Sequence, residues 1–429
     1  MYKSNSNDKF GVIMEQTHYF ALADTYQTPL YIYDLERITQ AFCAIKDAFK
    51  ARKSLICYAL KANSNLSIVH HLAQLGSGAD CVSIGEVRRA LRAGIPKYKI
   101  IFSGVGKQDN EIQEALESDI LFLNVESEEE LTRIESIAKK LNKIARISVR
   151  VNPNIDAKTH PYISTGLSEN KFGVDIEQAK SMYIFAKNAQ FLEPIGIHFH
   201  IGSQITDLEP IKQSAQKIAQ LAHSLLALKI DLKFFDIGGG IGIRYSDESL
   251  INPYDYAQAI LEALYGLDLT IICEPGRFLV GESGVLLTRV LYEKHNGHKR
   301  FVIVDAAMND LMRPALYRAI HQVEYFLRDK RADSSLESSL CDIVGPICES
   351  SDYLAKNIPL PPLQAGDLLI LKNAGAYGYS MASNYNTRPR PAEVAIMQGN
   401  ARLIKHRESF EKMIEDEESL LQDTLQTSL

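Results

Sequence analysis

Residues 56–65 read ICYALKANSN, a short apolar run followed closely by a lysine, Lys61. Seven more runs of the same kind follow along the chain: GADCVS, KIIFSG, ILFLNV, ARISVRV, IGIHFHI, FFDIGG and TIICEPG. Runs that are rich in β-branched and aromatic residues and bounded by turn residues indicate strands. Because these runs are apolar on both faces, they predict parallel strands that are covered by helices.

Amphipathic stretches separate these strands. Apolar side chains recur every three or four residues over 68–75, 85–93, 110–118 and 128–141, which is the spacing of one helix face. Eight βα units predict an α/β fold of the (β/α)8 TIM-barrel type. A doubly wound sheet is the structural alternative. The glycine run GGGIG does not favour it, because Ile243 stands where the fingerprint GxGxxG requires its third glycine.

The sequence changes character after residue 285. Short apolar runs separated by Gly, Pro and Asn, such as RFVIVDAA and GDLLILKN, replace the βα alternation and predict an antiparallel β-domain. We therefore expect a barrel over residues 30–285 and a C-terminal β-domain over 286–429. Residues 1–29 are expected to join the β-domain and to add a strand to it. The residues from Ser409 onward predict an acidic, exposed helix.

Composition excludes several classes of protein. The formal net charge is -6 and the basic residues form only short clusters, so nucleic acid is not an expected partner. The first ten residues lack the apolar core of a signal peptide, and no apolar run approaches the ~20 residues that span a bilayer. We expect a cytoplasmic protein without a membrane partner. Six cysteines without close pairing indicate reduced thiols, and no CxxC pair suggests zinc.

The chemistry of such barrels lies at the carboxyl ends of the strands. The residues expected there combine an amine, an imidazole, glycines, and a carboxylate beside a guanidinium: Lys61, Asp80, Ser83, Asn152, His200, Gly238, Gly239, Gly240, Glu274 and Arg277. This set can be stated before any reaction is known. It predicts one site that faces the mouth of the barrel.

Lys61 is the most informative member of this set. A lysine at the end of an apolar strand usually extends its ammonium group to the rim. Burial and adjacent positive charge would instead lower its pKa, as a Schiff base with an aldehyde cofactor requires. Three successive glycine N–H groups could then hold a cofactor phosphate, although three glycines also suit a tight turn. Glu274 could pair with Arg277, or could keep a pyridine nitrogen protonated.

His200 is open to more than one interpretation. It could be a satisfied barrel histidine, or a flat ring that stacks on a cofactor. Together with His198 it forms an HxH pair, but metal binding needs further ligands, and no other His-rich strand end offers them; we expect no metal. In the second domain, Cys348 could be an inert core thiol, and Tyr377 follows a Gly-rich turn that could expose its hydroxyl to a ligand.

Nine motifs, in order, resemble the alanine-racemase-like class of pyridoxal-phosphate enzymes and, within it, the diaminopimelate decarboxylase family. They are YALKAN, GADCVSIGE, KFG, HFHIGSQ, DIGGGIG, EPGRFLV, DAAMNDLMRPALY, GPICESSD and NAGAYGYSM. Each is weak alone, but nine in register over nearly the whole chain are specific. The resemblance implies a barrel plus a β-domain in a homodimer whose two active sites each borrow residues from the other subunit.

The resemblance also implies a role for individual residues. Lys61 is expected to form the Schiff base with pyridoxal 5'-phosphate, His200 to stack on its ring, and Cys348 to return a proton to the α-carbon. Cofactor-binding positions are Lys61, His200, Ser203, Gly238, Gly239, Gly240, Glu274, Pro275, Gly276, Arg277 and Tyr377. Substrate-binding positions are Arg277, Arg313, Tyr317, Glu349 and Tyr377. Cys348 and Glu349 are expected to reach the site from the partner chain.

The implied reaction is decarboxylation of meso-2,6-diaminopimelate to L-lysine and CO2, the last step of lysine biosynthesis. Arg277 and Arg313 suit a distal carboxylate, since a planar guanidinium binds it with two bonds. The alternatives are an ornithine or carboxynorspermidine decarboxylase of the same fold, and a non-catalytic binding homologue. In ornithine-type decarboxylases the equivalent motif looks like Cys-Asp, whereas this chain has Cys-Glu-Ser. A non-catalytic homologue should have lost Lys61 or Cys348, and both are present.

Overall fold

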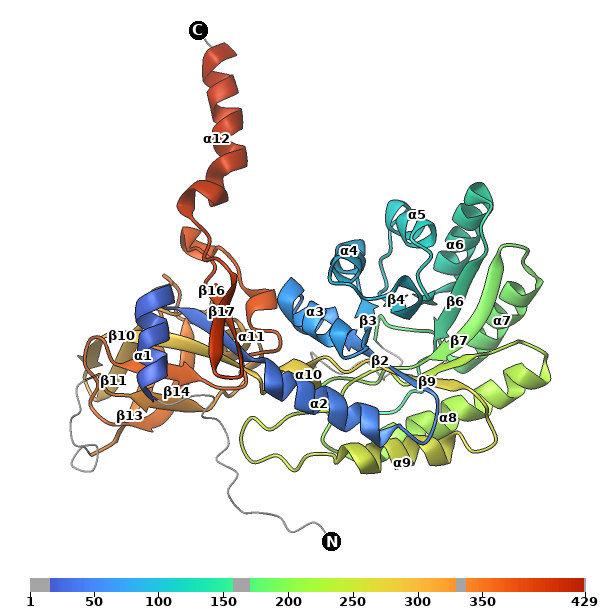
Figure 1. Cartoon of the computed structure of the whole chain (residues 1–429), viewed down its shortest axis with the longest axis horizontal. Coiled ribbons are helices and arrows are strands. Elements are labelled where there is room, and N and C mark those ends of the chain that lie inside the picture. The colour runs from blue at the N-terminus through green and yellow to red at the C-terminus, as the bar shows by residue number, and fades with distance from the viewer. Residues whose placement is uncertain (1–15, 157–169, 329–336, 428–429) are drawn as a thin grey trace. The chain divides into compact units, whose positions relative to one another are not determined.

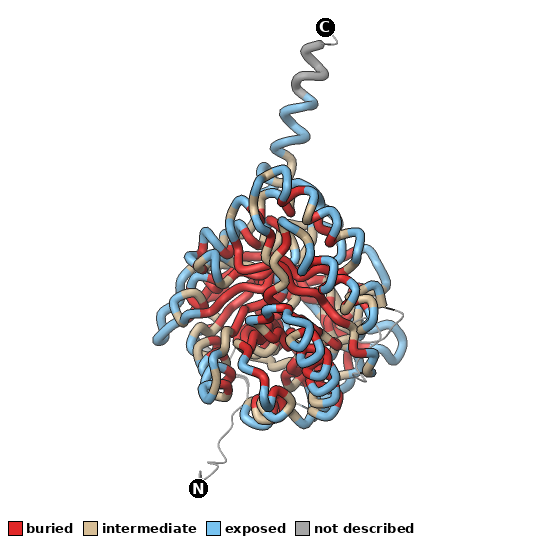
Figure 2. Tube along the Cα trace, turned by 90° about the vertical axis from the view of Figure 1, so that its right-hand side faces the viewer, coloured by how far each residue is buried: buried red, intermediate tan, exposed pale blue. Residues whose placement is uncertain are grey.

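The computed structural model describes residues 16–156, 170–328 and 337–427, and the chain divides into two units. One unit is Leu35–Glu282, and the other combines Met1–Asp34 with Ser283–Leu429 (Figure 1). Within each unit, buried residues follow the strands and exposed residues follow the outer helices (Figure 2). Among the described residues, no helix has the length and hydropathy needed to cross a bilayer.

The first unit is a closed barrel of eight parallel strands among the described residues. These are β2 (Ser54–Ala59), β3 (Gly78–Cys81), β4 (Ile100–Phe102), β5 (Phe122–Val125), β6 (Ala145–Arg150), β7 (Leu192–His198), β8 (Phe234–Asp236) and β9 (Thr270–Cys273). β2 pairs with β9 to close the ring. The predicted barrel is confirmed, and closure rules out the doubly wound sheet, which would have two edges.

Helices connect and cover the barrel strands. They are α2 (Leu35–Ala48), α3 (Leu66–Gln74), α4 (Ile84–Arg92), α5 (Asp109–Glu117), α6 (Glu128–Leu141), α7 (Ile176–Asn188), α8 (Leu208–Ala227), α9 (Pro253–Ala263) and α10 (Arg277–Val280). Several begin at a residue whose side chain accepts from a backbone N–H of the first turn, such as Ser83 for α4 and Ser127 for α6. These caps satisfy donors that lack a partner inside the helix, and so fix where each helix begins after its strand.

The second unit is built around a sheet of nine described strands. They are β1 (Leu30–Asp34), β10 (Gly284–Asn296), β11 (Lys299–Val304), β12 (Val323–Phe326), β13 (Ser339–Val344), β14 (Tyr353–Leu360), β15 (Leu368–Leu371), β16 (Ala392–Met397) and β17 (Asn400–Lys405). Most pairs are antiparallel, as predicted, but β1 with β16 and β11 with β13 are parallel. The predicted boundary at residue 30 assigns β1 to the barrel, whereas its pairing places it in this sheet.

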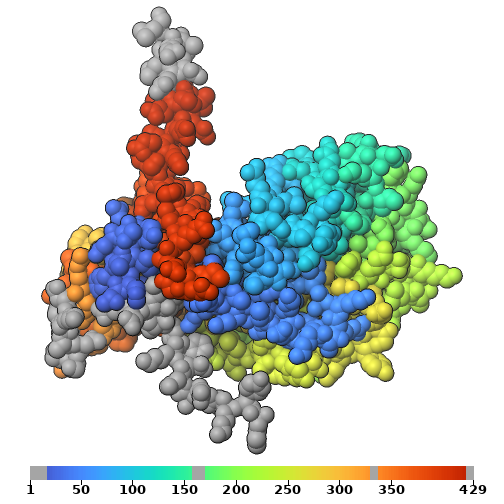
Figure 3. Space-filling model, in the orientation of Figure 1, coloured from blue at the N-terminus to red at the C-terminus, as the bar shows by residue number. Residues whose placement is uncertain are grey.

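Among its described residues the second unit has three α-helices: α1 (Gln16–Tyr26), α11 (Arg313–Tyr317) and α12 (Phe410–Thr427). Apolar residues from both ends of the chain form its core, including Leu30 and Ile32 of β1, Leu287 of β10 and Val394 of β16. α12 extends away from the strands of its own unit (Figure 3). Its side chains are largely exposed as far as they are described.

Candidate active site

A pocket of about 470 Å³ opens at the carboxyl ends of the barrel strands. Polar residues at or after the ends of β2, β3, β6, β7 and β9 form part of its lining, namely Lys61, Asp80, Arg150, His198, His200 and Glu274. A volume of this size is typical of small-molecule sites. The pocket contains Lys61, Asp80, His200 and Glu274 of the residues predicted at the mouth of the barrel, and its walls belong to the barrel unit.

Lys61 lies in a short 3-10 turn, η1 (Leu60–Ala62), directly after β2. Its Nζ donates to Asp80 Oδ2 at 2.6 Å, and 40% of its side chain is exposed, whereas Asp80 is fully buried. The expectation that burial and neighbouring positive charge prepare this amine is therefore wrong in this structure. The nearest charged group is a carboxylate, which can hold the ammonium group in place.

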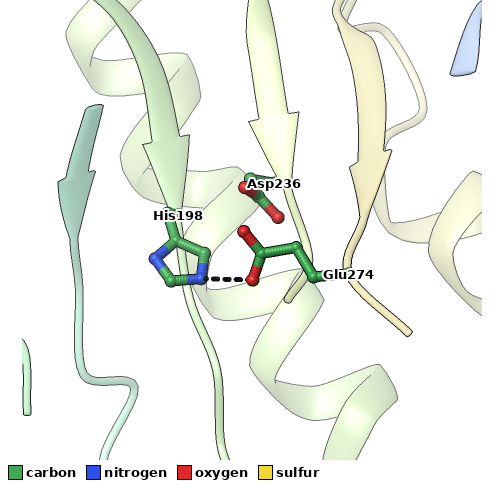
Figure 4. Close-up of side chains that lie close together, drawn as sticks. All are labelled: His198, Asp236 and Glu274. Atoms are coloured by element: carbon green, nitrogen blue, oxygen red, sulfur yellow. Dashed lines mark ion pairs between the residues drawn. The ribbon is translucent and has the colours of Figure 1, made fainter. Parts of the chain in front are cut away.

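His198, Asp236 and Glu274 converge from the ends of the neighbouring strands β7, β8 and β9 (Figure 4). His198 Nε2 lies 3.4 Å from Glu274 Oε2, and both side chains are buried. Asp236 Oδ1 accepts from the backbone N–H of Gly238 at 2.9 Å. Glu274 Oε1 and Asp236 Oδ2 are also buried, and no N–H group or hydroxyl among the described residues donates to either oxygen.

The protonation states in this cluster depend on one another. Burial raises the pKa of Asp236 well above its usual value, and the neighbouring charge of Glu274 raises it further. Burial also opposes ionisation of Glu274, but His198, Lys61 and a hydrogen bond from Asp236 bring its pKa below the usual range. Two adjacent buried carboxylates do not both ionise easily. Glu274 thus carries the negative charge, and Asp236 carries a proton that it donates to Glu274.

The same three side chains offer ligand atoms that lie within 4.8 Å of one another. The prediction that His198 lacks further metal ligands is wrong, because Asp236 and Glu274 lie beside it. One imidazole and two carboxylates form an acceptable ligand set for zinc. The prediction that no metal binds remains a prediction.

His200 follows β7, and its Nδ1 accepts from the backbone N–H of Gly239 at 3.3 Å. Burial lowers the pKa of His200 well below its usual value, and the positive charges of Arg150 and Lys61 lower it further. The ring is therefore neutral and carries its proton on Nε2. A neutral, flat ring at the pocket wall suits stacking on an aromatic ligand.

The turn after β8 requires its glycines. A Cβ at Gly239 would lie 2.2 Å from the carbonyl oxygen of Glu274, and one at Gly240 would lie 2.4 Å from the carbonyl oxygen of Gly202. Two of the three N–H groups predicted to hold a phosphate are engaged within the protein, Gly238 with Asp236 and Gly239 with His200. The tight-turn interpretation is therefore correct for this structure, and a role in phosphate binding stays a prediction.

Arg277 lies at the start of α10, next to Pro275 and Gly276, and all three are buried. Its Nη2 donates to Ser203 Oγ at 3.0 Å and its Nη1 donates to the hydroxyl of Tyr245 at 2.8 Å. The structure thus brings together Ser203 and Arg277, two predicted phosphate contacts that are far apart in sequence. A guanidinium beside a hydroxyl can bind an anion.

The remaining predicted residues belong to the second unit. Cys348 and Glu349 are exposed. The backbone N–H of Cys348 donates to Asn386 Oδ1 at 2.9 Å, and Tyr385 donates its hydroxyl proton to Glu349 Oε2 at 2.8 Å. Ser351 donates to Glu349 Oε1, and these two hydroxyls keep the pKa of Glu349 below its usual range.

Three more predicted residues lie elsewhere in this unit. Arg313 is the buried first residue of α11, and Tyr317 is its half-buried last residue. Tyr377 is half-buried and has a φ of 57°, a left-handed conformation that is uncommon outside glycine.

The contacts of three barrel carboxylates and cations do not follow from the sequence motifs. Asp80 is expected at the mouth, but its pairing with Lys61 is not. Asp236 and Arg150 are not among the expected site residues, although Arg150 lines the pocket and pairs with Glu126 at 3.1 Å. All three lie at or near the carboxyl ends of β3, β8 and β6. A search of every strand end for charged residues would have found them.

Comparison with known proteins agrees with this geometry. The family model described as pyridoxal-dependent decarboxylase, pyridoxal binding domain, matches residues 35–281. The chain is 60% identical over 396 residues to diaminopimelate decarboxylase of Helicobacter pylori (strain J99), which covers 92% of this chain and 97% of the relative. It is 58% identical over 404 residues to the Campylobacter jejuni diaminopimelate decarboxylase, covering 94% and 99%.

The chain belongs to the diaminopimelate decarboxylase family. The crystal structure of the Helicobacter pylori member of this family, complexed with L-lysine, has a TM-score of 0.90 and 59% identity to this chain, and the match covers 94% of this chain and 99% of that one. The chain is therefore a carboxy-lyase, and pyridoxal phosphate is the cofactor of its family.

The pocket fits the cofactor of this decarboxylase family. An anionic Glu274 lines it with a buried carboxylate, and no N–H group or hydroxyl of the described residues donates to its Oε1. A protonated pyridine nitrogen would supply an N–H donor to this carboxylate. Lys61 and the neutral ring of His200 line the same pocket. Glu274, Lys61 and His200 thus offer a nitrogen partner, an amine and a stacking surface.

Proposed function

We propose that this chain decarboxylates meso-2,6-diaminopimelate to L-lysine and CO2, as the last step of lysine biosynthesis, with pyridoxal 5'-phosphate as its cofactor. One observation carries the proposal: an amine, Lys61, and a buried anionic carboxylate, Glu274, line the same pocket. The relatives that are 58% and 60% identical are both named diaminopimelate decarboxylase, which supports the choice of substrate.

Each barrel residue has a distinct task in this proposal. Lys61 would hold the cofactor covalently, and Asp80 Oδ2 would orient its nitrogen and accept a hydrogen bond from it. Glu274 would bind the pyridine nitrogen, and Ser203 with Arg277 would hold the phosphate. When bound, pyridoxal phosphate supplies the electron sink that accepts the electrons left behind by CO2.

The second unit would supply recognition of the substrate and a proton. Arg313, with Tyr317 and Tyr377, would bind the distal carboxylate, and Glu349 would bind the distal amine. Cys348 would return a proton to the α-carbon after CO2 has left. A thiol next to an exposed carboxylate and a tyrosine hydroxyl is accessible to solvent and to a partner.

We further propose a cytoplasmic homodimer in which Cys348 and Glu349 reach the partner's barrel pocket. The exposure of both residues supports this arrangement, because a group that acts only within its own chain need not lie on an open surface. Mixing Lys61→Ala chains with Glu349→Ala chains tests it. Mixed dimers contain one intact site and should regain part of the lost activity; verified mixed dimers without recovery would show that each chain supplies its own residues.

The substrate is tested by CO2 release from the holoenzyme with meso-diaminopimelate, ornithine or carboxynorspermidine. Release from meso-diaminopimelate with stoichiometric L-lysine is expected. Ornithine lacks the distal carboxylate that Arg313 would bind, so it should react much more slowly. A preference for ornithine or carboxynorspermidine would replace the proposed substrate, and no release from any of them would favour a non-catalytic homologue.

A further inference from the structure

His321 lies between Arg313 and a backbone carbonyl, and it was not among the residues expected at the site. Its Nε2 lies 3.0 Å from Arg313 Nη1, and its Nδ1 lies 2.7 Å from the carbonyl oxygen of Lys372. Both His321 and Arg313 are buried. The three residues belong to the same unit, so these contacts depend only on its own fold.

Only one protonation state of His321 satisfies both contacts. A guanidinium can only donate, so Nε2 must be the unprotonated nitrogen that accepts from Arg313. A carbonyl oxygen can only accept, so Nδ1 must carry the proton that it donates to Lys372. The imidazole is therefore neutral, with its proton on Nδ1.

The carbonyl that contacts His321 belongs to a hydrogen-bonded part of the sheet. Lys372 directly follows β15, and its backbone N–H donates to the carbonyl oxygen of Gln322 at 2.9 Å. β12 and β15 continue this pairing, with Val323 opposite Leu371. The ring of His321 is thus anchored by neighbouring strands and can hold the flexible side chain of Arg313 in one orientation.

This contact orients a charge without cancelling it. Two other buried arginines, Arg150 and Arg300, contact the carboxylates of Glu126 and Glu293. The neutral imidazole of His321 brings no negative charge of its own to Arg313, so this contact fixes the direction of the guanidinium without neutralising it. That combination suits a guanidinium that must bind the carboxylate of a ligand.

We propose that His321 is a positioning residue that orients Arg313 toward the distal carboxylate of the substrate and of the product. The proposal rests on the proposed function, which assigns that carboxylate to Arg313. His321 acts through Arg313 and does not itself contact the reacting atoms. Its loss should weaken ligands that carry the distal carboxylate and spare those that lack it.

Three variants of His321 separate its two contacts. His321→Leu removes both the acceptor and the donor at similar volume. His321→Asn keeps a donor near the Nδ1 position for the carbonyl of Lys372, but is too short to accept from Arg313. His321→Gln places an acceptor near the Nε2 position. His321→Asn also provides the test if His321→Leu does not fold, because it leaves the carbonyl with a partner.

The experiment measures inhibition of the holoenzyme by L-lysine and by cadaverine, which is L-lysine without its carboxylate. Loss of a hydrogen bond to a charged group should weaken L-lysine roughly tenfold or more in the Leu and Asn variants. Cadaverine should change by less than about threefold, and the Gln variant should recover most of the affinity for L-lysine. In the same variants the KM for meso-diaminopimelate should rise together with the inhibition constant of L-lysine, while kcat changes less.

Two results would overturn the proposal. Unchanged L-lysine affinity in a folded Leu or Asn variant would show that Arg313 does not need His321. Equal weakening of L-lysine and cadaverine would show that His321 supports the whole site and not carboxylate binding. Failure of the proposed function is distinct, because the wild-type holoenzyme would then release no CO2 from meso-diaminopimelate.

Discussion

The barrel pocket and the surface around Glu349 hold their carboxylates in opposite ways. In the pocket, Glu274 is buried beside His198 and Asp236, and their protonation states depend on one another. Glu349 is exposed, and two hydroxyl groups from Ser351 and Tyr385 hold it. One carboxylate is set by a buried network, and the other is oriented by neutral donors while water screens its charge.

This difference has consequences for mutation. In a buried network, the loss of one charge changes the state of every neighbour, because little water is present to compensate. At an exposed site, the loss of one hydrogen bond removes orientation and little else. Substitutions in the pocket should therefore have larger effects than substitutions around Glu349.

The largest effect is expected for Lys61→Ala in the pocket. Loss of the amine that would attach the cofactor should remove most of the activity. Borohydride reduction of the wild-type holoenzyme should leave a pyridoxyl label on the peptide that contains Lys61, and the variant should lack that label. Lys97→Ala, which removes an exposed lysine paired with Asp119, is the control. A label on another lysine only would reject the assignment.

The next largest effect is expected for Glu274→Gln. An amide in place of the anionic partner should lower kcat by roughly a hundredfold, a magnitude typical for loss of one fixed electrostatic contact. The absorption spectrum of the bound cofactor should also shift, because its nitrogen would no longer face a negative charge.

Asp236→Asn is the matched control for this charge assignment. A protonated Asp236 and an asparagine can each accept from Gly238 and donate to Glu274, so this variant should keep its activity within about threefold of the wild type. If Asp236→Asn were as damaging as Glu274→Gln, the negative charge would belong to Asp236.

The pH dependence of stability gives a third test of the buried network. Burial, Arg150 and Lys61 lower the pKa of His200, so the unfolded chain binds a proton that the folded chain does not bind. The contribution of neutral His200 to the free energy of unfolding is fully present above roughly 6.5, the pKa of a histidine in the unfolded chain. It is lost as pH falls below that value, by at most about 1.4 kcal/mol per pH unit. Chemical denaturation of the cofactor-free chain and of His200→Gln should show the wild type losing stability faster below that pH. Parallel curves would contradict a neutral His200.

The smallest effect is expected at the exposed carboxylate. Tyr385→Phe removes one hydrogen bond to Glu349 and should raise the KM for meso-diaminopimelate about threefold with little change in kcat. Glu349→Gln should raise the KM more, since it removes the charge itself. A larger effect of Tyr385→Phe than of Glu349→Gln would break the comparison between the two regions.

Local pattern was sufficient to predict the barrel, because each βα unit repeats the same apolar spacing. It was not sufficient for the second sheet. β14 and β17 alternate apolar and polar residues or are largely exposed, so they lack the continuous apolar runs that indicate buried strands. The parallel pairing of β1 with β16 joins segments from opposite ends of the chain, and nothing in either segment specifies its partner.

The residues of the candidate site also fall into two groups, those that the sequence predicts and those that it does not. Lys61, His200 and Glu274 were predicted because strand ends gather at the mouth of a barrel. The partners of these residues were not predicted, since Asp80 and Asp236 are single carboxylates with no motif around them. His321 was missed for a related reason: its role depends on a carbonyl 51 residues away. Such contacts follow from strand pairing and not from residues that are adjacent in sequence.

β1 lies between β10 and β16 in the second sheet. During translation Leu30–Asp34 leaves the ribosome early, whereas its parallel neighbour Ala392–Met397 is made near the end of the chain. The barrel can close first, because all its strands lie between these two segments. A chain that terminates before β16 would leave the backbone N–H and C=O groups along one side of β1 open to another molecule. Nonsense mutations late in the gene are therefore expected to yield aggregates rather than a free, working barrel.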